Sequence, residues 1–151
     1  APVSLRRAAT DPSGFAADLG ASFRRTGFAV VADLGIDPAL IDRALADTKA
    51  FFALPDDVKR RYHMPGTGGA RGYTPFGIEA AKDANTADLK EFWHVGRDLP
   101  PGPRYRRYMP DNLWPDQVAG FQASVGALYA ALDAMGATLL RAIARNLGLD
   151  E

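Results

Sequence analysis

The sequence has no cysteine and only two histidines, and these shortages exclude several kinds of site at the outset. Without cysteine there are no disulfides, thiolate nucleophiles or thiolate metal ligands, a composition compatible with a reducing cytoplasm. Basic and acidic side chains number 18 each, so no excess of one sign attracts nucleic acid or an anionic membrane. The first residues also lack the basic-then-apolar pattern of a signal peptide. We therefore expect a cytoplasmic protein with neither kind of partner.

The remaining composition is that of an ordinary globular protein. Its 151 residues are 47% hydrophobic and 24% charged, which suits one domain with a single core. No internal repeat and no clear domain boundary is visible along the chain.

The first part of the chain predicts a helix followed by a short strand. Asp11 is suited to the N-cap position and Pro12 to the first position of a helix. Phe15, Leu19 and Phe23 then recur every four residues, which places them on one face. We expect this helix over 12–25, ended by a glycine at position 27. The following "FAVVA", residues 28–32, is typical of a buried strand.

Further elements follow in the same way. A second helix is predicted from about residue 38 to 54, and Pro55 opens a short third helix whose acidic start and basic end suit the helix dipole. The glycine-rich stretch 64–72 is predicted to be a loop. "GYTPF" and "LKEFWHV" are expected to be strands, and a proline-rich irregular segment follows them.

The last element is predicted to be one long helix from about residue 115 to 147. Over about 33 residues it would span roughly 50 Å. Apolar residues cover most of its surface, and the preceding elements are too few to bury them. Asp133 and Gln122 interrupt the run and no basic flank precedes it, which argues against a membrane span. We expect this helix to pack against a sheet that is largely absent from the chain.

The stretch "DLKEFWHVG" contains His94, and its surroundings decide whether that histidine is a ligand. Strand alternation places Glu91 on the face opposite to His94. No His-X-Asp, His-X-His or His-X3-His pattern occurs, and His63 lies 31 residues away. We expect a core or hydrogen-bonded structural role for His94. A metal hydrolase built on His63 and His94 stays open only if their side chains meet.

Other candidate motifs are weak. The glycine-rich "PGTGGARG" lacks the Lys-Ser/Thr pair and the following helix that a phosphate loop needs. Arg71, at its end, is suited to holding a carboxylate through two parallel hydrogen bonds. "RYRRY", residues 104–108, interleaves basic and aromatic side chains, but it is too small a patch to predict nucleic-acid binding. No serine lies in a nucleophile-elbow context.

Taken in order, several segments resemble one enzyme family. "GFAVVADLGID", "AFFALPDDVKRRY", "GARGYTPFG", "DLKEFWHVGRDLP" and the long helix closing on "LGLDE" are similar to the N-terminal region of isopenicillin N synthase-like iron(II)/2-oxoglutarate-dependent oxygenases. The resemblance covers roughly residues 13–151. One difference is Leu34, where many members carry a histidine that is not a metal ligand.

The family's metal and co-substrate motifs are absent from the chain. Iron is held there by a His-X-Asp pair and a distant histidine, and 2-oxoglutarate by an Arg-X-Ser pair, and neither pattern occurs here. In the family both lie on jelly-roll strands that follow the long helix. The resemblance therefore implies an α+β fold: the N-terminal helices, first strands and backbone helix of a double-stranded β-helix oxygenase, without the catalytic core strands.

The resemblance implies the following function. Residues 1–151 would be the N-terminal non-haem dioxygenase domain of an enzyme that uses Fe(II) and 2-oxoglutarate to hydroxylate, desaturate or cyclise a small molecule. The chain alone would be inactive and bind neither cofactor, and its partner would be the missing jelly-roll half. Arg71 and Tyr73 match the segment that can supply substrate contacts, and no catalytic or metal residue is carried over. The alternative is a free-standing α+β interaction module without catalytic activity.

Overall fold

The computed structural model describes residues 1–80, 86–100, 105 and 109–150, and these form two compact units. Unit 1 comprises residues 1–41 and 127–151, and unit 2 comprises residues 42–126. Each unit has its own hydrophobic core. The sequence predicts a single core, and the structure differs because the buried side chains form two clusters, one around Phe15 and Leu19 and one around Phe51.

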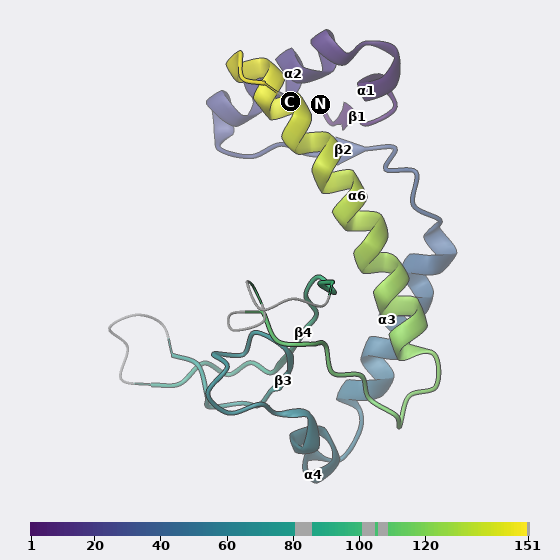
Figure 1. The fold of residues 1–151 in the computed structure, drawn as a ribbon, viewed down its shortest axis with the longest axis vertical. Helices are drawn as coiled ribbons and strands as arrows, with labels where there is room; N and C mark the ends of the chain where they lie inside the picture. The colour runs from purple at the N-terminus through teal and green to yellow at the C-terminus, as the bar shows by residue number, and fades with distance from the viewer. Residues whose placement is uncertain (81–85, 101–104, 106–108, 151) are drawn as a thin grey trace. The chain divides into compact units, whose positions relative to one another are not determined.

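Unit 1 begins with strand β1 (Val3–Ser4) and helix α1 (Arg7–Thr10), neither of which the sequence predicts. Helix α2 (Pro12–Thr26) agrees with the predicted helix to within one residue (Figure 1). The Asp11 carboxylate accepts a hydrogen bond from the Gly14 amide at 2.9 Å and caps the helix start. Gly27, with φ of 73°, ends the helix in a left-handed conformation that glycine adopts without strain.

A small parallel sheet completes unit 1 together with the C-terminal part of α6. Strand β2 (Val31–Ala32) pairs with β1, so that Val3 lies opposite Val31. The core contains Val3, Phe15, Ala16, Leu19 and Ala142. Gly20 allows α2 and α6 to approach closely, because a Cβ there would lie within 2.4 Å of the Asn146 side chain.

Unit 2 contains most of α3 (Pro38–Phe52), then α4 (Asp56–Lys59) and the 3₁₀ turn η1 (Arg60–Tyr62). Strands β3 (Gly72–Thr74) and β4 (Phe92–His94) pair in antiparallel fashion, with Tyr73 opposite Trp93. Both strands lie inside the segments that the sequence predicts. Phe51, Tyr73 and Phe121 form the buried centre of the core, and further aromatic rings surround them. The two units thus have cores of different chemistry.

Helix α6 (Phe121–Leu147) contributes its first turns to unit 2 and the rest to unit 1. It starts six residues later than predicted, because Gly120 has a φ of 94°, which no α-helix contains. By length and composition α6 could cross a membrane, but a core helix of a soluble protein passes the same test. Only 6% of its most apolar 18-residue window is buried within the described chain. As the sequence predicts, this helix has more apolar surface than the described residues cover.

Candidate functional site

Strands β3 and β4 bring a buried polar network together in unit 2. The Tyr73 hydroxyl donates to Glu91 Oε2 at 2.5 Å, and Lys59 Nζ contacts the same oxygen at 2.8 Å. The ammonium group also lies 3.1 Å from Asp56 and 5.7 Å from the centre of the Tyr73 ring. Lys59 is 4% exposed and Tyr73 is 1% exposed. The network ties α4 to β3 and to the residue that precedes β4 through a desolvated ion pair.

The network shifts the acid–base properties of two of its members. Burial, reinforced by the hydrogen bond to Glu91, raises the pKa of Tyr73 to about 12. The hydrogen bond to Glu91 likewise raises the pKa of Lys59, and this effect outweighs the opposing effect of burial. At neutral pH the lysine is therefore charged and the tyrosine is protonated, as the ion pair and the hydrogen bond require.

Arg71, two residues before Tyr73, is also buried, with 7% of its surface exposed. Its Nη1 donates to the neighbouring Ala70 carbonyl at 2.6 Å. Its Nε and Nη2 have no hydrogen-bond partner among the described residues. A buried guanidinium without an anion is unfavourable, so this group suits an oxygen-rich or negatively charged neighbour.

Gly96 and Asn112 support the Arg71 guanidinium. A Cβ at Gly96 would lie 2.0–2.3 Å from the guanidinium atoms, so only glycine leaves room for it. The Asn112 side chain accepts a hydrogen bond from the Gly96 amide at 2.9 Å and donates one to the Gly96 carbonyl at 2.8 Å. Asn112 also donates to Asp98 at 2.7 Å. The hydrogen bonds from Asn112 hold the backbone of Gly96 in place, and the Arg71 guanidinium lies against that backbone.

His94 is an exposed residue whose Nδ1 is hydrogen bonded to the Gly69 carbonyl, and its ring centre lies 4.6 Å from that of Phe92. Glu91 projects to the opposite face, toward Tyr73, as strand alternation predicts. The predicted hydrogen-bonded role of His94 is confirmed, whereas a place in the core is wrong.

His63 and Met64 line a hollow of about 720 Å³ beside the glycine-rich turn. Within the described ranges no three His, Asp or Glu side chains are grouped to hold a metal ion. These residues therefore do not fit a catalytic iron. The described geometry gives the metal-hydrolase alternative no support.

The structure thus places both predicted site residues on or beside β3, but in different surroundings. Arg71 has unused donor groups, whereas the Tyr73 hydroxyl is already bonded to Glu91. Sequence reasoning missed Lys59, Gly96 and Asn112. A lysine in the run "DDVKRRY" looks like a surface residue, and only its burial reveals its role. The "RYRRY" stretch lies largely outside the described residues, with Tyr105 alone described and exposed.

Comparison with known proteins identifies the family. Residues 3–117 match the family model described as non-haem dioxygenase in morphine synthesis N-terminal. The chain is 35% identical over 135 residues to the 2-oxoglutarate-dependent dioxygenase citB of Monascus ruber, an alignment covering 81% of this chain and 40% of that protein. The chain spans less than half the length of the curated relatives it matches.

Solved structures agree with this match. A putative 2OG-Fe(II) oxygenase family protein from Caulobacter crescentus is 53% identical, with a TM-score of 0.87 over 99% of this chain and 49% of its own. A full-length protein of Neurospora crassa, solved in complex with alpha-KG, shares the fold, with a TM-score of 0.78 at 23% identity over 98% of this chain and 47% of its own. The chain therefore belongs to the family of non-haem, 2-oxoglutarate-dependent dioxygenases and corresponds to their N-terminal region.

Proposed function

We propose that this chain is the N-terminal part of an iron(II)- and 2-oxoglutarate-dependent oxygenase that oxidises a small molecule by hydroxylation, desaturation or cyclisation. One observation carries the proposal: a chain that matches the oxygenase from C. crescentus over 99% of its own length spans only 49% of that protein. The iron and 2-oxoglutarate motifs, which are absent here, would lie in the jelly-roll strands of the remaining half. Fe(II) and 2-oxoglutarate would supply the oxidising chemistry there.

The proposal is tested by comparing the full-length protein with residues 1–151 alone. The full-length protein that contains this chain should convert 2-oxoglutarate to succinate in the presence of iron(II) and oxygen, faster when its substrate is added. Residues 1–151 alone should form no succinate and should bind iron(II) no better than background. Calorimetry that shows stoichiometric, micromolar iron(II) binding to residues 1–151 would overturn the assignment of the metal site to the other half.

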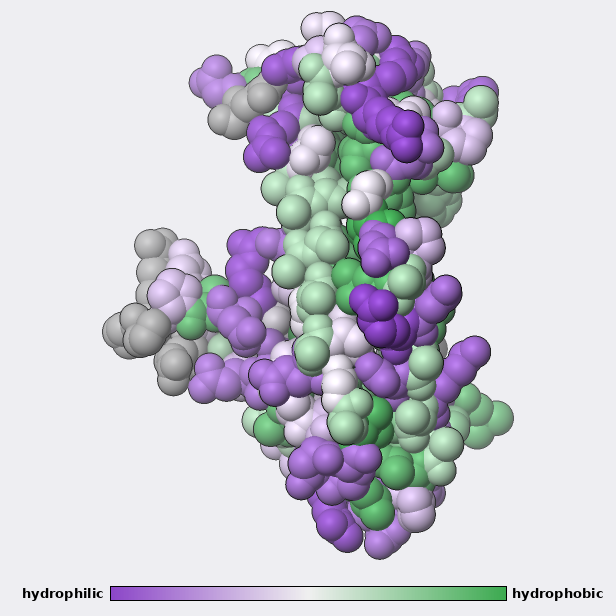
Figure 2. Space-filling model, turned by 90° about the vertical axis from the view of Figure 1, so that its right-hand side faces the viewer, coloured by the Kyte–Doolittle hydropathy of each residue, from purple (hydrophilic) through white to green (hydrophobic). Residues whose placement is uncertain are grey.

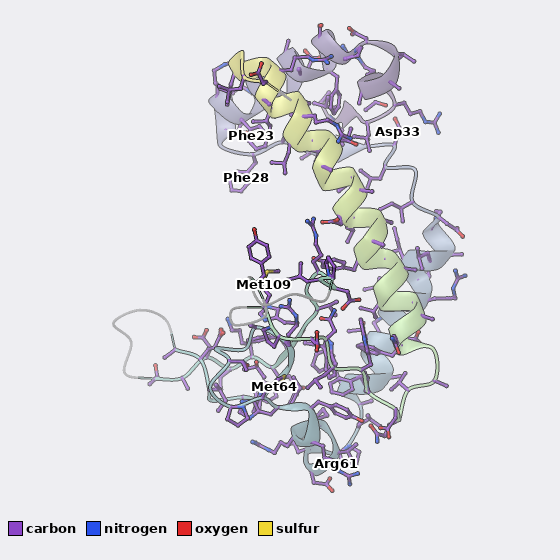
Figure 3. All side chains as sticks on the ribbon, viewed as in Figure 1. Phe23, Phe28, Asp33, Arg61, Met64 and Met109 are labelled. Atoms are coloured by element: carbon purple, nitrogen blue, oxygen red, sulfur yellow. The ribbon has the colours of Figure 1, made fainter. Side chains whose placement is uncertain are left out.

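Within this chain we propose that Arg71 contacts the substrate through a carboxylate or a similar oxygen group. Its two unpartnered nitrogens support that role, because they can form a pair of parallel hydrogen bonds. For Tyr73, which is predicted to contact substrate as well, the described contacts favour holding the strand in place through Glu91. Arg71→Lys should raise KM by about tenfold or more with little change in kcat. Arg61→Ala, at an exposed arginine (Figure 3), is the matched control and should leave both unchanged.

The remaining assignments are also proposals. We propose a cytoplasmic protein with neither nucleic-acid nor membrane partners, supported by the absence of cysteine and the balanced charge. The alternative of a free-standing interaction module is favoured by one observation, the uncovered apolar surface of α6. The intact mass of the natural protein separates the two, because a free-standing module would have about the mass of residues 1–151 and an oxygenase about twice that mass.

A further inference from the structure

The glycine-rich turn covers one face of the β3–β4 pair. Tyr73 and Trp93 lie opposite one another in this pair and belong to the aromatic core. Thr74, the next residue along β3, therefore directs its side chain to the other face. On that face the Gly69 carbonyl is hydrogen bonded to His94 Nδ1, and a Cβ at Gly69 would lie 2.9 Å from Thr74 Oγ1. The turn thus lies directly against the Thr74 hydroxyl.

The Thr74 hydroxyl is buried and lacks a hydrogen-bond partner. The residue is 1% exposed, and its Oγ1 forms no hydrogen bond with any residue that the structure describes. The Thr67 hydroxyl, in the same turn, donates to the Met64 carbonyl at 2.8 Å. A buried hydroxyl without a partner costs free energy that a valine of the same shape would avoid. The Thr74 hydroxyl therefore suits a bound molecule that forms the missing hydrogen bond.

Thr74 also lines the hollow beside this turn, whose volume of about 720 Å³ is that of a small-molecule site. Met64 and Ile78 give the hollow apolar walls. Glu79, the carboxylate of the lining, is paired with Lys90, whose Nζ lies 2.8 Å from Glu79 Oε2. Apolar walls and a carboxylate that already has its cation favour a ligand that carries no net charge.

Exposed apolar residues alone do not mark this site. In the space-filling view, hydrophobic residues reach the surface between hydrophilic ones (Figure 2). Ile78, which is 55% exposed, is therefore ordinary when taken by itself. The hollow differs because apolar walls, a buried hydroxyl without a partner and a glycine beside that hydroxyl occur together.

We infer that this hollow binds a small uncharged molecule whose hydroxyl or carbonyl group hydrogen bonds to Thr74 Oγ1. The apolar body of the molecule packs against Met64 and Ile78, and Gly69 leaves beside the hydroxyl the space that a side chain would fill. This inference goes beyond the proposed function and does not depend on it. Arg71 is not among the described residues that line the hollow, and binding is measured without iron(II) or 2-oxoglutarate.

Methyl NMR of the full-length protein tests the site directly, with 2-naphthol as the probe. This probe is uncharged at neutral pH, and its rings shift the resonances of the methyl groups that they contact. The Met64 and Ile78 methyl resonances should move together and saturate with a Kd on the order of 1 mM or lower. The Met135 methyl of α6, in unit 1, is the internal control and should not move. Unchanged Met64 and Ile78 resonances up to the solubility limit of the probe would sink the inference.

Thr74→Val distinguishes a ligand-binding hydroxyl from a structural one. The substitution keeps the shape of the side chain and removes only the unpartnered hydroxyl, so it should raise the melting temperature of the full-length protein by about 2 °C. It should also weaken 2-naphthol binding by about fivefold. A lower melting temperature indicates that the hydroxyl already has a partner in the full-length protein and contradicts the inference, as does an unchanged Kd.

Thr48→Val is the matched control, because Thr48 Oγ1 already donates to the Ala44 carbonyl at 2.7 Å within α3. This variant makes the same chemical change outside the hollow. It should leave the Kd for 2-naphthol unchanged and should not raise the melting temperature.

A charged analogue, 2-naphthoate, tests the class of ligand. It carries a carboxylate in place of the hydroxyl and should bind about tenfold or more weakly than 2-naphthol. Equal or tighter binding of 2-naphthoate would overturn the uncharged class. Succinate formation, measured on the same full-length sample, separates this inference from the proposed function. Methyl shifts without turnover of 2-oxoglutarate remove the oxygenase assignment and leave the hollow as a binding site, and turnover without methyl shifts does the reverse.

Discussion

The two units of this chain stabilise themselves in different ways. Unit 1 has a mostly aliphatic core around Phe15 and Leu19, ion pairs that are exposed, and a sheet of two short strands. Unit 2 has an aromatic core around Phe51 and a buried network around Lys59. Unit 2 buries an ion pair between side chains distant in sequence, and it also holds the buried polar atoms of Arg71, Thr74 and Trp93 that have no hydrogen-bond partner among the described residues. The difference lies in what each unit buries, which is an apolar cluster in unit 1 and an ion pair beside aromatic rings in unit 2.

Removing the central aromatic ring from each core should give the largest loss of stability, and the two losses can be compared between the units. Phe15 and Phe51 are both fully buried, so Phe15→Ala and Phe51→Ala should each cost about 3–5 kcal/mol of unfolding free energy. Phe51 also meets five aromatic rings, with ring centres 4.7–6.0 Å apart. We expect Phe51→Ala to cost about 1 kcal/mol more than Phe15→Ala.

Urea denaturation with two probes measures both changes. The tryptophans, Trp93 and Trp114, both belong to unit 2, so their fluorescence reports on that unit, while circular dichroism follows all helices. Phe28→Ala, at a residue 76% exposed, is the control and should change the free energy of unfolding by less than about 0.5 kcal/mol. A larger cost for Phe15→Ala than for Phe51→Ala contradicts the proposed difference between the cores.

The buried ion pair of unit 2 should be sensitive to the loss of one partner and tolerant of the loss of both. Lys59→Met leaves the Glu91 carboxylate poorly compensated and should cost about 3 kcal/mol. Adding Glu91→Gln, which keeps an acceptor for Tyr73, should recover most of that loss. The double variant is then more stable than the single one, an outcome that urea denaturation can detect.

Arg7→Met is the matched control in unit 1. Its guanidinium contacts Asp11 and Asp18 at 2.7 and 2.5 Å, but all three side chains are at least 39% exposed. Exposed pairs contribute little to stability because water screens them, so this variant should lose far less than Lys59→Met. Equal losses would remove the distinction between the polar interactions of the two units.

The regular elements could be predicted from the sequence because their signals are local. The cap at Asp11, the left-handed glycine at 27 and the alternation around His94 each depend on a few neighbouring residues, and the structure contains all three features. Strand β1 could not be predicted, since two residues carry no periodic pattern. The sequence places the start of α6 too early because Val118 fits the helical spacing, although Gly120 interrupts the helix.

The candidate site could be predicted only in part, because its contacts join distant segments. Arg71 and Tyr73 belong to a local motif that the sequence reveals. Lys59 and Glu91 are 32 residues apart in the sequence, and Asn112 and Gly96 are 16 apart. No sequence pattern predicts a contact between residues at either of these separations. The separation into two cores has the same origin, because which apolar residues meet depends on how helices and loops pack rather than on composition.

The smallest expected difference between the two units is a loss of stability at alkaline pH, which comes from unit 2. The pKa of Tyr73 is raised to about 12, from about 10 in an unfolded chain, so the folded state holds this proton more tightly. Its contribution is complete below pH 10 and is lost as the pH rises from 10 to 12. The raised pKa of Lys59 acts in the same direction.

Urea midpoints measured by tryptophan fluorescence should therefore fall over this range in the wild-type chain. They should fall less in Tyr73→Phe, which retains only the Lys59 contribution. An unchanged slope in Tyr73→Phe would show that the buried hydroxyl is not what makes unit 2 sensitive to alkali.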